Sequence, residues 1–277
     1  MRPAMRNDKP DETMKDKLTE AQIRETGASL HRALRARAPL APLTETWPGL
    51  SIDDAYRIQL AMVRHRIDAG ERVVGKKIGV TSRVVMDMLD VRQPDFGHLL
   101  SGMVHGDGAA IAADTLIAPK AEGEIAFVLK ADLEGPGVTN ADVLRATACV
   151  LPCFEIVDSR IRDWKIRIQD TVADNASSGV FVLGDAAVDP CGLDLGTVGM
   201  TLEKNGEIVA TGAGAAALGH PANAVAWLAN TLGRLGLGLK QGEVILSGSL
   251  AAMVPVKAGD QLRISLGGIG SAGVRFV

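Results

Sequence analysis

Two glutamates lie two residues apart in an apolar segment, Ala121–Leu129, whose sequence is AEGEIAFVL. Alternate side chains of a β-strand share a face, so Glu122 and Glu124 would point the same way, and the large apolar side chains at 125, 127 and 129 the other way. Adjacent carboxylates repel each other and resist burial unless a divalent cation lies between them. Oxygen ligands suit a hard ion such as Mg²⁺ or Mn²⁺. The alternative is an edge strand with both charges in solvent.

A third glutamate interrupts another apolar segment, Val150–Val157, whose sequence is VLPCFEIV. In these surroundings Glu155 is either a paired structural group or a third metal ligand. Three carboxylates on two central strands would leave positions on the ion for substrate and water, as a catalytic metal site requires.

A lysine pair and an aspartate are the other candidates for chemistry. The segment Gly75–Gly79 reads GKKIG, and on a strand Lys76 and Lys77 face opposite sides, so one of them can point inward. An inward lysine near a metal could anchor a carboxylate or shuttle a proton. The alternative is two exposed charges at a sheet edge. Asp95 lies in a turn-like segment, Pro94–His98, where it either forms the turn or acts as an acid or base.

Other familiar sites are not supported by the sequence. His98 and His220 have no partner at a ligand spacing, so we expect both to be structural or peripheral. The glycine-rich segments 212–214 and 267–270 do not fit the strand–GxGxxG–helix pattern of dinucleotide-binding proteins, and Walker A and GxSxG patterns are absent. Ser159–Ser178 is rich in polar groups, and it is either a surface loop with a short helix or an active-site lid.

Composition limits the class of protein. The chain has 277 residues, of which 47% are hydrophobic and 3% aromatic, so it can form a large core built on aliphatic side chains. A net charge of -3 and the lack of a basic tract argue against nucleic-acid binding. Three cysteines outside any metal pattern favour a reducing, cytoplasmic location, and no apolar run approaches the ~20 residues that cross a bilayer.

The elements that must position these residues can be predicted from periodicity and turn signals. Residues 1–20 are expected to form a flexible tail, residues 21–75 a helical portion, and residues 76–277 the metal-binding catalytic domain. Within the helical portion, helices are expected from Leu18 to about Ala36 and from Ser51 to Gly70. A third helix is expected from Pro221 to near Gly236, and Asn205-Gly206 predicts a hairpin. Strands are predicted over Val73–Val80, Ala121–Lys130, Val150–Val157, Val180–Leu183, Met200–Lys204, Glu207–Thr211, Val244–Ser247, Gln261–Leu266 and Ala272–Val277. This order predicts an α+β fold with a mostly antiparallel or mixed sheet.

Several of these segments together resemble a known family. From Ser51 to Val277 the chain is similar to the fumarylacetoacetate-hydrolase-like superfamily, and within it to 2-hydroxypenta-2,4-dienoate (2-keto-4-pentenoate) hydratases and 4-oxalocrotonate decarboxylases. The segments that carry the resemblance are GKKIG, QPDFGHL, AEGEIAFVL, SRIRDW, DTVADNAS, NGEIVATGAGAAALGHP and GEVILSGSL.

The resemblance implies a mixed β-roll core with a smaller N-terminal α/β portion, dependence on Mg²⁺ or Mn²⁺, and a homo-oligomer. Matched residue by residue, it implies metal ligands, a catalytic lysine with an acidic partner, and two further substrate-binding serines. The implied metal ligands are Glu122, Glu124 and Glu155. The implied catalytic lysine is Lys77, which also binds substrate, and its acidic partner is Asp95. The implied substrate-binding serines are Ser177 and Ser247.

The activity that the resemblance implies is hydration of 2-hydroxypenta-2,4-dienoate in the meta-cleavage degradation of aromatic compounds. The stretch Arg162–Trp164 is more similar to the hydratases than to the decarboxylases. The alternatives are decarboxylation of 2-oxo-3-hexenedioate (4-oxalocrotonate) on the same scaffold, and a non-catalytic partner of another pathway enzyme. The expected ligand is a small 2-hydroxy-dienoate or 2-oxo acid, with no nucleic acid and no membrane. The expected homo-oligomer stands alone or associates with another pathway enzyme.

Overall fold

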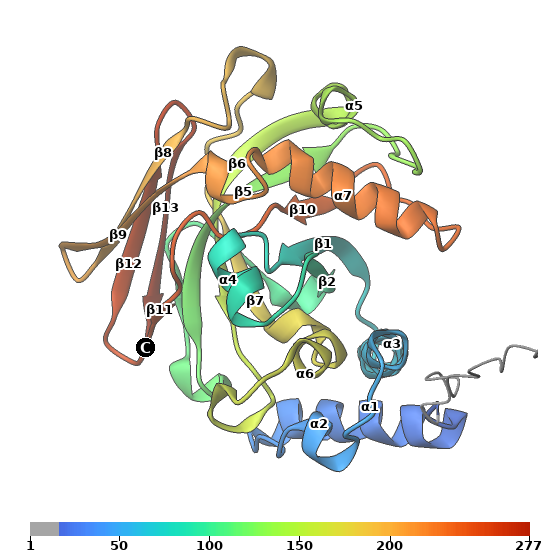
Figure 1. Cartoon of the computed structure of the whole chain (residues 1–277). Helices are drawn as coiled ribbons and strands as arrows, with labels where there is room; N and C mark the ends of the chain where they lie inside the picture. The colour runs from blue at the N-terminus through green and yellow to red at the C-terminus, as the bar shows by residue number, and fades with distance from the viewer. Residues whose placement is uncertain (1–16) are drawn as a thin grey trace, which may run out of the picture.

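The computed structural model describes residues 17–277 and contains two β-sheets flanked by helices (Figure 1). The helices are α1 (Glu20–Ala36), α2 (Leu43–Thr46), α3 (Ile52–Asp68), α4 (Arg83–Met88), α5 (Asn140–Ala146), α6 (Ile168–Ala173) and α7 (Pro221–Gly233). The predicted α+β class is confirmed.

The larger sheet holds the segments that were predicted to carry the chemistry. Its strands lie in the order β2-β1-β10-β5-β6-β7-β3, with β11 paired to the start of β5, and most neighbours are antiparallel. The strands are β1 (Val73–Gly79), β2 (Asp95–Leu100), β3 (Val104–Gly106), β5 (Lys120–Leu129), β6 (Thr147–Val157), β7 (Ser178–Leu183), β10 (Val244–Leu246) and β11 (Val254–Pro255).

The smaller sheet has five strands in the order β4-β13-β12-β8-β9 and lies at the left of Figure 1. Its strands are β4 (Ala109–Ile111), β8 (Gly199–Lys204), β9 (Glu207–Ala213), β12 (Gln261–Leu266) and β13 (Gly270–Phe276). Strands β8 and β9 form the predicted hairpin at Asn205-Gly206.

The main core contains side chains from both sheets together with α7. Phe127 and Phe154 of the larger sheet belong to the same buried cluster as Ile264 and Phe276 of the smaller sheet and Leu228 of α7. Hydrophobic residues alternate with polar ones along β12, because one face of that sheet is buried and the other is in solvent.

The N-terminal helices form their own buried cluster. The Thr19 side chain and Gln22 make reciprocal hydrogen bonds that cap α1, and the Ser51 hydroxyl accepts from the Asp54 N–H at the start of α3. Leu30 of α1 and Ile58 of α3 belong to one cluster, which also contains residues of α6. Because α6 contributes to this cluster, the N-terminal helices are packed against a segment that leads into the candidate site.

The structure differs from two expectations for the chain and leaves a third open. The predicted tail, residues 1–20, falls mostly outside the described residues, but its last part is ordered, since the Leu18 N–H donates to the Asp54 carboxylate. The prediction of a turn at Pro94–His98 is wrong, because Asp95 begins strand β2, which pairs with β1. The boundary predicted at residue 75 falls inside β1 and stays a prediction.

Candidate metal centre and active site

Three glutamates converge on one face of the β5–β6 pair. Glu122 lies directly opposite Glu155 in the antiparallel register, and Glu124 lies two residues further along the same face of β5. One carboxylate oxygen from each glutamate lies within 4.8 Å of the others. Glu124 and Glu155 are fully buried, and Glu122 is half-buried.

The spacing of the two glutamates on β5 depends on the glycine between them. A Cβ at Gly123 would lie 2.4 Å from the Met200 sulfur of β8, because the smaller sheet packs against the opposite face of β5 at this point. The AEGE sequence therefore combines two carboxylates on one face with a close contact between the sheets on the other.

The donor set fits a hard divalent cation. Gly248 donates its N–H to Glu124 Oε2 at 2.7 Å, but Glu124 Oε1 and Glu155 Oε1 are buried and accept no hydrogen bond from the described residues. Buried carboxylate oxygens without partners are costly, and oxygen ligation by Mg²⁺ or Mn²⁺ would satisfy them.

Without a bound metal, the charges of the glutamates raise one another's pKa values. Burial, and after it the charge of Glu155, raises the pKa of Glu122 to about 7. Burial likewise raises the pKa of Glu124 well above its ordinary value, with Glu155 and Glu122 adding to the effect. A cation bound among these carboxylates would relieve their mutual repulsion.

A lysine ammonium lies beside the carboxylates. Lys77 Nζ is 3.2 Å from Glu155 Oε2, and it donates to the Ala176 carbonyl at 3.0 Å. Burial alone would lower the pKa of Lys77, but the surrounding carboxylates, led by Glu155 and Asp95, outweigh burial and raise it. Lys76 points to the other side and pairs with Glu243 at 2.7 Å. The two lysines thus face opposite sides, and both are buried instead of lying at an exposed edge.

The carbonyl that holds Lys77 belongs to an unusual backbone segment. Asn175, Ala176 and Ser177 all have positive φ angles, of 54°, 51° and 52°, which side-chain-bearing residues rarely adopt. A buried ion pair supports this segment, since Arg160 Nε donates to Asp174 Oδ1 at 2.5 Å. This half of the Ser159–Ser178 segment is buried, so it is not a surface loop.

Asp95 completes the charged cluster. Its Oδ1 is buried without a hydrogen-bond partner among the described residues, and burial raises its pKa although Lys77 opposes the rise. A Cβ at Gly79 would lie 2.3 Å from Asp95 Oδ1 and 3.2 Å from Lys77 Nζ. Glycine at position 79 therefore leaves open the space that these two side chains share.

The two serines are buried next to this cluster, but their hydroxyls already have partners in the protein. Ser177 Oγ lies 3.3 Å from Thr171 Oγ, and Ser247 Oγ donates to the Ile125 carbonyl at 2.9 Å. Ser247 directly precedes Gly248, the residue whose N–H binds Glu124. Gly79, Gly248 and the 175–177 backbone were not predicted as parts of the site.

The histidines stay outside this cluster. His98 Nδ1 lies 3.1 Å from Gln59 Oε1, and burial lowers the pKa of His98 to about 4. His220 caps the first turn of α7, where its ring nitrogen accepts from the Ala222 N–H. Each of these histidines thus has a partner within the protein, and their expected structural or peripheral role stays a prediction.

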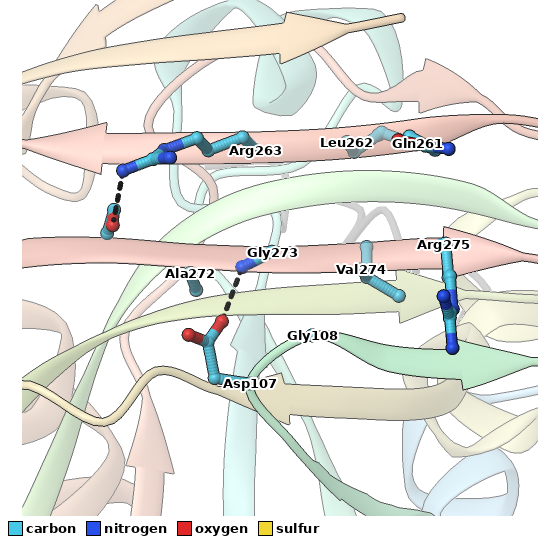
Figure 2. Close-up of a pocket in the computed structure, with 10 residues that line it drawn as sticks. Asp107, Gly108, Gln261, Leu262, Arg263, Ala272, Gly273, Val274 and Arg275 are labelled. Carbon is cyan, nitrogen blue, oxygen red and sulfur yellow. Dashed lines mark hydrogen bonds between the residues drawn. The ribbon is translucent and has the colours of Figure 1, made fainter.

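Two cavities lie near the strands, and they differ in their relation to the cluster. A cavity of about 380 Å³ is lined by β12, β13 and Asp107, and the Asp107 carboxylate accepts from the Gly273 N–H there (Figure 2). None of the predicted site residues lines it. A second cavity, of about 250 Å³, has Asp95 in its wall.

Comparison with known proteins places the chain in a family. Residues 78–277 match the family described as fumarylacetoacetate (FAA) hydrolase, C-terminal. The chain belongs to this family. The match begins at the residue after Lys77 and covers the predicted acidic residues and both serines.

Individual relatives are similar over nearly their whole length. The chain is 58% identical to 2-hydroxyhexa-2,4-dienoate hydratase from Comamonas testosteroni, over 94% of this chain and 99% of that protein. It is 62% identical to 2-hydroxypent-2,4-dienoate hydratase from Pseudomonas putida, over 78% of this chain and 97% of that protein.

A solved structure is also similar, namely 4-oxalocrotonate decarboxylase from Pseudomonas putida G7 in complex with magnesium and adipate. It matches with a TM-score of 0.92 and 38% identity, over 94% of this chain and 99% of that chain. Within residues 17–277, we find no helix with the length and hydropathy needed to span a membrane.

Proposed function

We propose that this protein is a metal-dependent hydratase that converts 2-hydroxypenta-2,4-dienoate to 4-hydroxy-2-oxopentanoate in aromatic meta-cleavage catabolism. The observation that carries the proposal is the convergence of three glutamate oxygens within 4.8 Å beside a buried lysine. The similarity to hydratases that are named for 2-hydroxy-dienoates supports this reaction.

The residues fit a division of roles. Glu122, Glu124 and Glu155 would hold Mg²⁺ or Mn²⁺. When bound, such an ion supplies a Lewis acid for the substrate carboxylate and C2 oxygen, where negative charge develops. The partnerless oxygens of Glu124 and Glu155 support this assignment.

Lys77 and Asp95 would handle the protons of the reaction. Ketonisation removes the proton of the C2 hydroxyl and adds one to C5, which leaves a C3–C4 double bond conjugated to the ketone. Water then adds its oxygen to C4, and a proton enters at C3, so the net change is the addition of one water. Lys77 Nζ is an ammonium held against Glu155, and Asp95 Oδ1 is free to accept or hold a proton.

The remaining assignments concern substrate binding and assembly. Ser177 and Ser247 are proposed as substrate-binding residues, because they are buried on the segments that position Lys77 and Glu124. We also propose a cytoplasmic homo-oligomer with a catalytic domain over residues 76–277. Ile208 and Val209, which are exposed on the edge strand β9, support an oligomer.

Decarboxylation of 2-oxo-3-hexenedioate is the second candidate. The observation that favours it is the TM-score of 0.92 to a 4-oxalocrotonate decarboxylase. Release of CO₂ from this six-carbon diacid, at a rate above dienoate hydration, would identify the protein as a decarboxylase.

An ultraviolet assay tests the hydratase proposal. Loss of the dienoate chromophore is followed with Mg²⁺ and after treatment with EDTA, and the product is identified by mass spectrometry. We expect metal-dependent formation of 4-hydroxy-2-oxopentanoate, and we expect Glu124→Ala to abolish it without changing the circular dichroism spectrum. Full activity of this variant or of the metal-stripped protein would reject the assignment.

A further inference from the structure

The cavity of about 250 Å³ beside Asp95 has a mainly apolar wall. Four aliphatic side chains line it together with the Tyr56 ring, and they come from α3, α6 and the loop before β2. These aliphatic residues are Ile52, Val91, Ile168 and Val172. This volume is several times the ~30 Å³ that one water occupies in the liquid, so the cavity has room for more than a single methyl group.

The wall is built on regular elements that keep its shape. Ile52 and Tyr56 lie one turn apart on α3, and Ile168 and Val172 lie one turn apart on α6, so each pair faces the same side of its helix. The Tyr56 ring stacks on Phe96 with 4.6 Å between ring centres. The cavity is thus a formed feature between packed helices.

Asp95 connects this cavity to the charged cluster. It lines the cavity, and its carboxylate approaches Gly79 together with Lys77, since a Cβ at Gly79 would lie 2.3 Å from Asp95 Oδ1 and 3.2 Å from Lys77 Nζ. A dienoate held by its carboxylate end at the glutamates would extend past Lys77 and Asp95 toward the aliphatic wall.

The charges around the cavity disfavour a second carboxylate on the ligand. Asp95 contributes an acidic group, and among the described lining residues the one cation is Arg92. The Arg92 side chain is 68% exposed and paired with Asp87 at 2.9 Å, so it offers little to a buried anion.

We propose that this cavity is the subsite for the carbon chain beyond C4 of the substrate, and that it selects 2-hydroxy-dienoates with a short alkyl end over those with a distal carboxylate. This inference rests on the proposed function, because it takes the glutamates as the anchor of the oxo-acid end. Ile52, Ile168 and Val172 are its specificity-determining residues.

Binding of saturated 2-oxo acids, which cannot be hydrated, tests the subsite separately from the reaction. Isothermal titration calorimetry on the Mg²⁺-loaded protein would compare 2-oxobutanoate, 2-oxopentanoate, 2-oxohexanoate and 2-oxohexanedioate. We expect affinity to rise about fourfold with each added carbon. We also expect 2-oxohexanedioate to bind at least tenfold more weakly than 2-oxohexanoate, since its carboxylate would be desolvated without a partner.

Two variants, which narrow the cavity from different helices, test whether the chain-length preference arises in this cavity. Ile52→Phe and Ile168→Phe should each reduce the affinity ratio of 2-oxohexanoate to 2-oxobutanoate by at least tenfold. Leu60→Phe is the matched control, because Leu60 lies on α3, is 52% exposed and does not line the cavity. The control should keep the wild-type ratio.

The outcomes separate the subsite from the reaction. Equal affinities across the alkyl series, tighter binding of the diacid, or an unchanged ratio in both cavity variants would overturn the subsite, even if the dienoate is hydrated. A chain-length preference that both variants remove, in a protein that does not hydrate the dienoate, would support the subsite and reject the reaction.

Discussion

Replacing Glu124 by glutamine should make the metal-free protein more stable and remove its stabilisation by metal. Glu124 is fully buried, and its Oε2 accepts from the Gly248 N–H, a bond that a glutamine carbonyl can keep. The substitution removes one of three converging negative charges while preserving side-chain shape. If Glu124 had only a structural role, replacing it by glutamine would instead lower the stability of the protein, with or without metal.

The effect follows from the causes that raise the pKa of Glu124, which are burial first and then the charges of Glu155 and Glu122. A neutral amide removes this repulsion. We expect the relief to contribute about 1–2 kcal/mol, which lies within the range of coupling energies between residues in contact. For a chain of this size, that raises Tm by roughly 2–6 °C.

Differential scanning fluorimetry at pH 8, with EDTA or with Mg²⁺, measures both effects. In the wild type, Mg²⁺ at about 100 times its Kd should add about 2.7 kcal/mol of stability. Glu124→Gln should have a higher Tm in EDTA and no shift with Mg²⁺, whereas Glu207→Gln, which changes an exposed glutamate on β9, should behave as wild type. A variant that is less stable in EDTA, or that keeps the wild-type Mg²⁺ shift, would refute the reasoning.

Three further predictions concern the surroundings of the cluster. Gly79→Ala should lower kcat at least ~100-fold while Mg²⁺ still shifts Tm, since its Cβ would lie 2.3 Å from Asp95 Oδ1; unchanged kcat would show that this space is not used. Arg160→Leu should cost about 3–5 kcal/mol in urea unfolding, because it leaves the Asp174 carboxylate buried and unpaired, and a loss below about 1 kcal/mol would contradict this. The folded-state pKa of Glu122 lies above its unfolded value, so the folded metal-free protein binds more protons, and its unfolding free energy should fall as pH rises from about 4.5 to 7. Saturating Mg²⁺ should reduce that fall and leave the part that comes from acids outside the cluster, such as Asp174, whose pKa burial raises to about 6. A fall that Mg²⁺ leaves unchanged would assign all of it to other groups.

Strand periodicity was sufficient to predict the arrangement within β5. An alternation of two residues puts Glu122 and Glu124 on one face wherever the strand lies, so the expectation did not depend on the rest of the fold. The position of Glu155 depends on register, and only the antiparallel pairing of β5 with β6 brings it opposite Glu122. The prediction that Glu155 is a metal ligand, and not a paired structural group, came from the resemblance and not from periodicity.

The contacts between distant parts of the chain that support the site could not be predicted from local sequence patterns. The segment that begins at Pro94 has turn-forming residues, yet it pairs along β1 because the sheet offers it a full set of backbone partners. The positive φ angles at 175–177 occur in an Asn-Ala-Ser sequence without glycine. The backbone on either side of them is held by Arg160, which donates to the carbonyls of Asp174 and Ser178. These bonds join residues more than a dozen positions apart, so no local signal indicates the three angles.

The rigidity of this surrounding structure explains why the charges stay together. Glu122, Glu124 and Glu155 are attached to paired central strands, so they cannot move apart to relieve their repulsion without breaking the sheet. Lys77 is held in the same way by β1 and by the Ala176 carbonyl. A fold that keeps three carboxylates in contact spends stability in the absence of a cation, and it recovers that stability in proportion to the affinity with which the cation binds. Metal affinity and metal-free stability should therefore change in opposite directions across variants of these three glutamates.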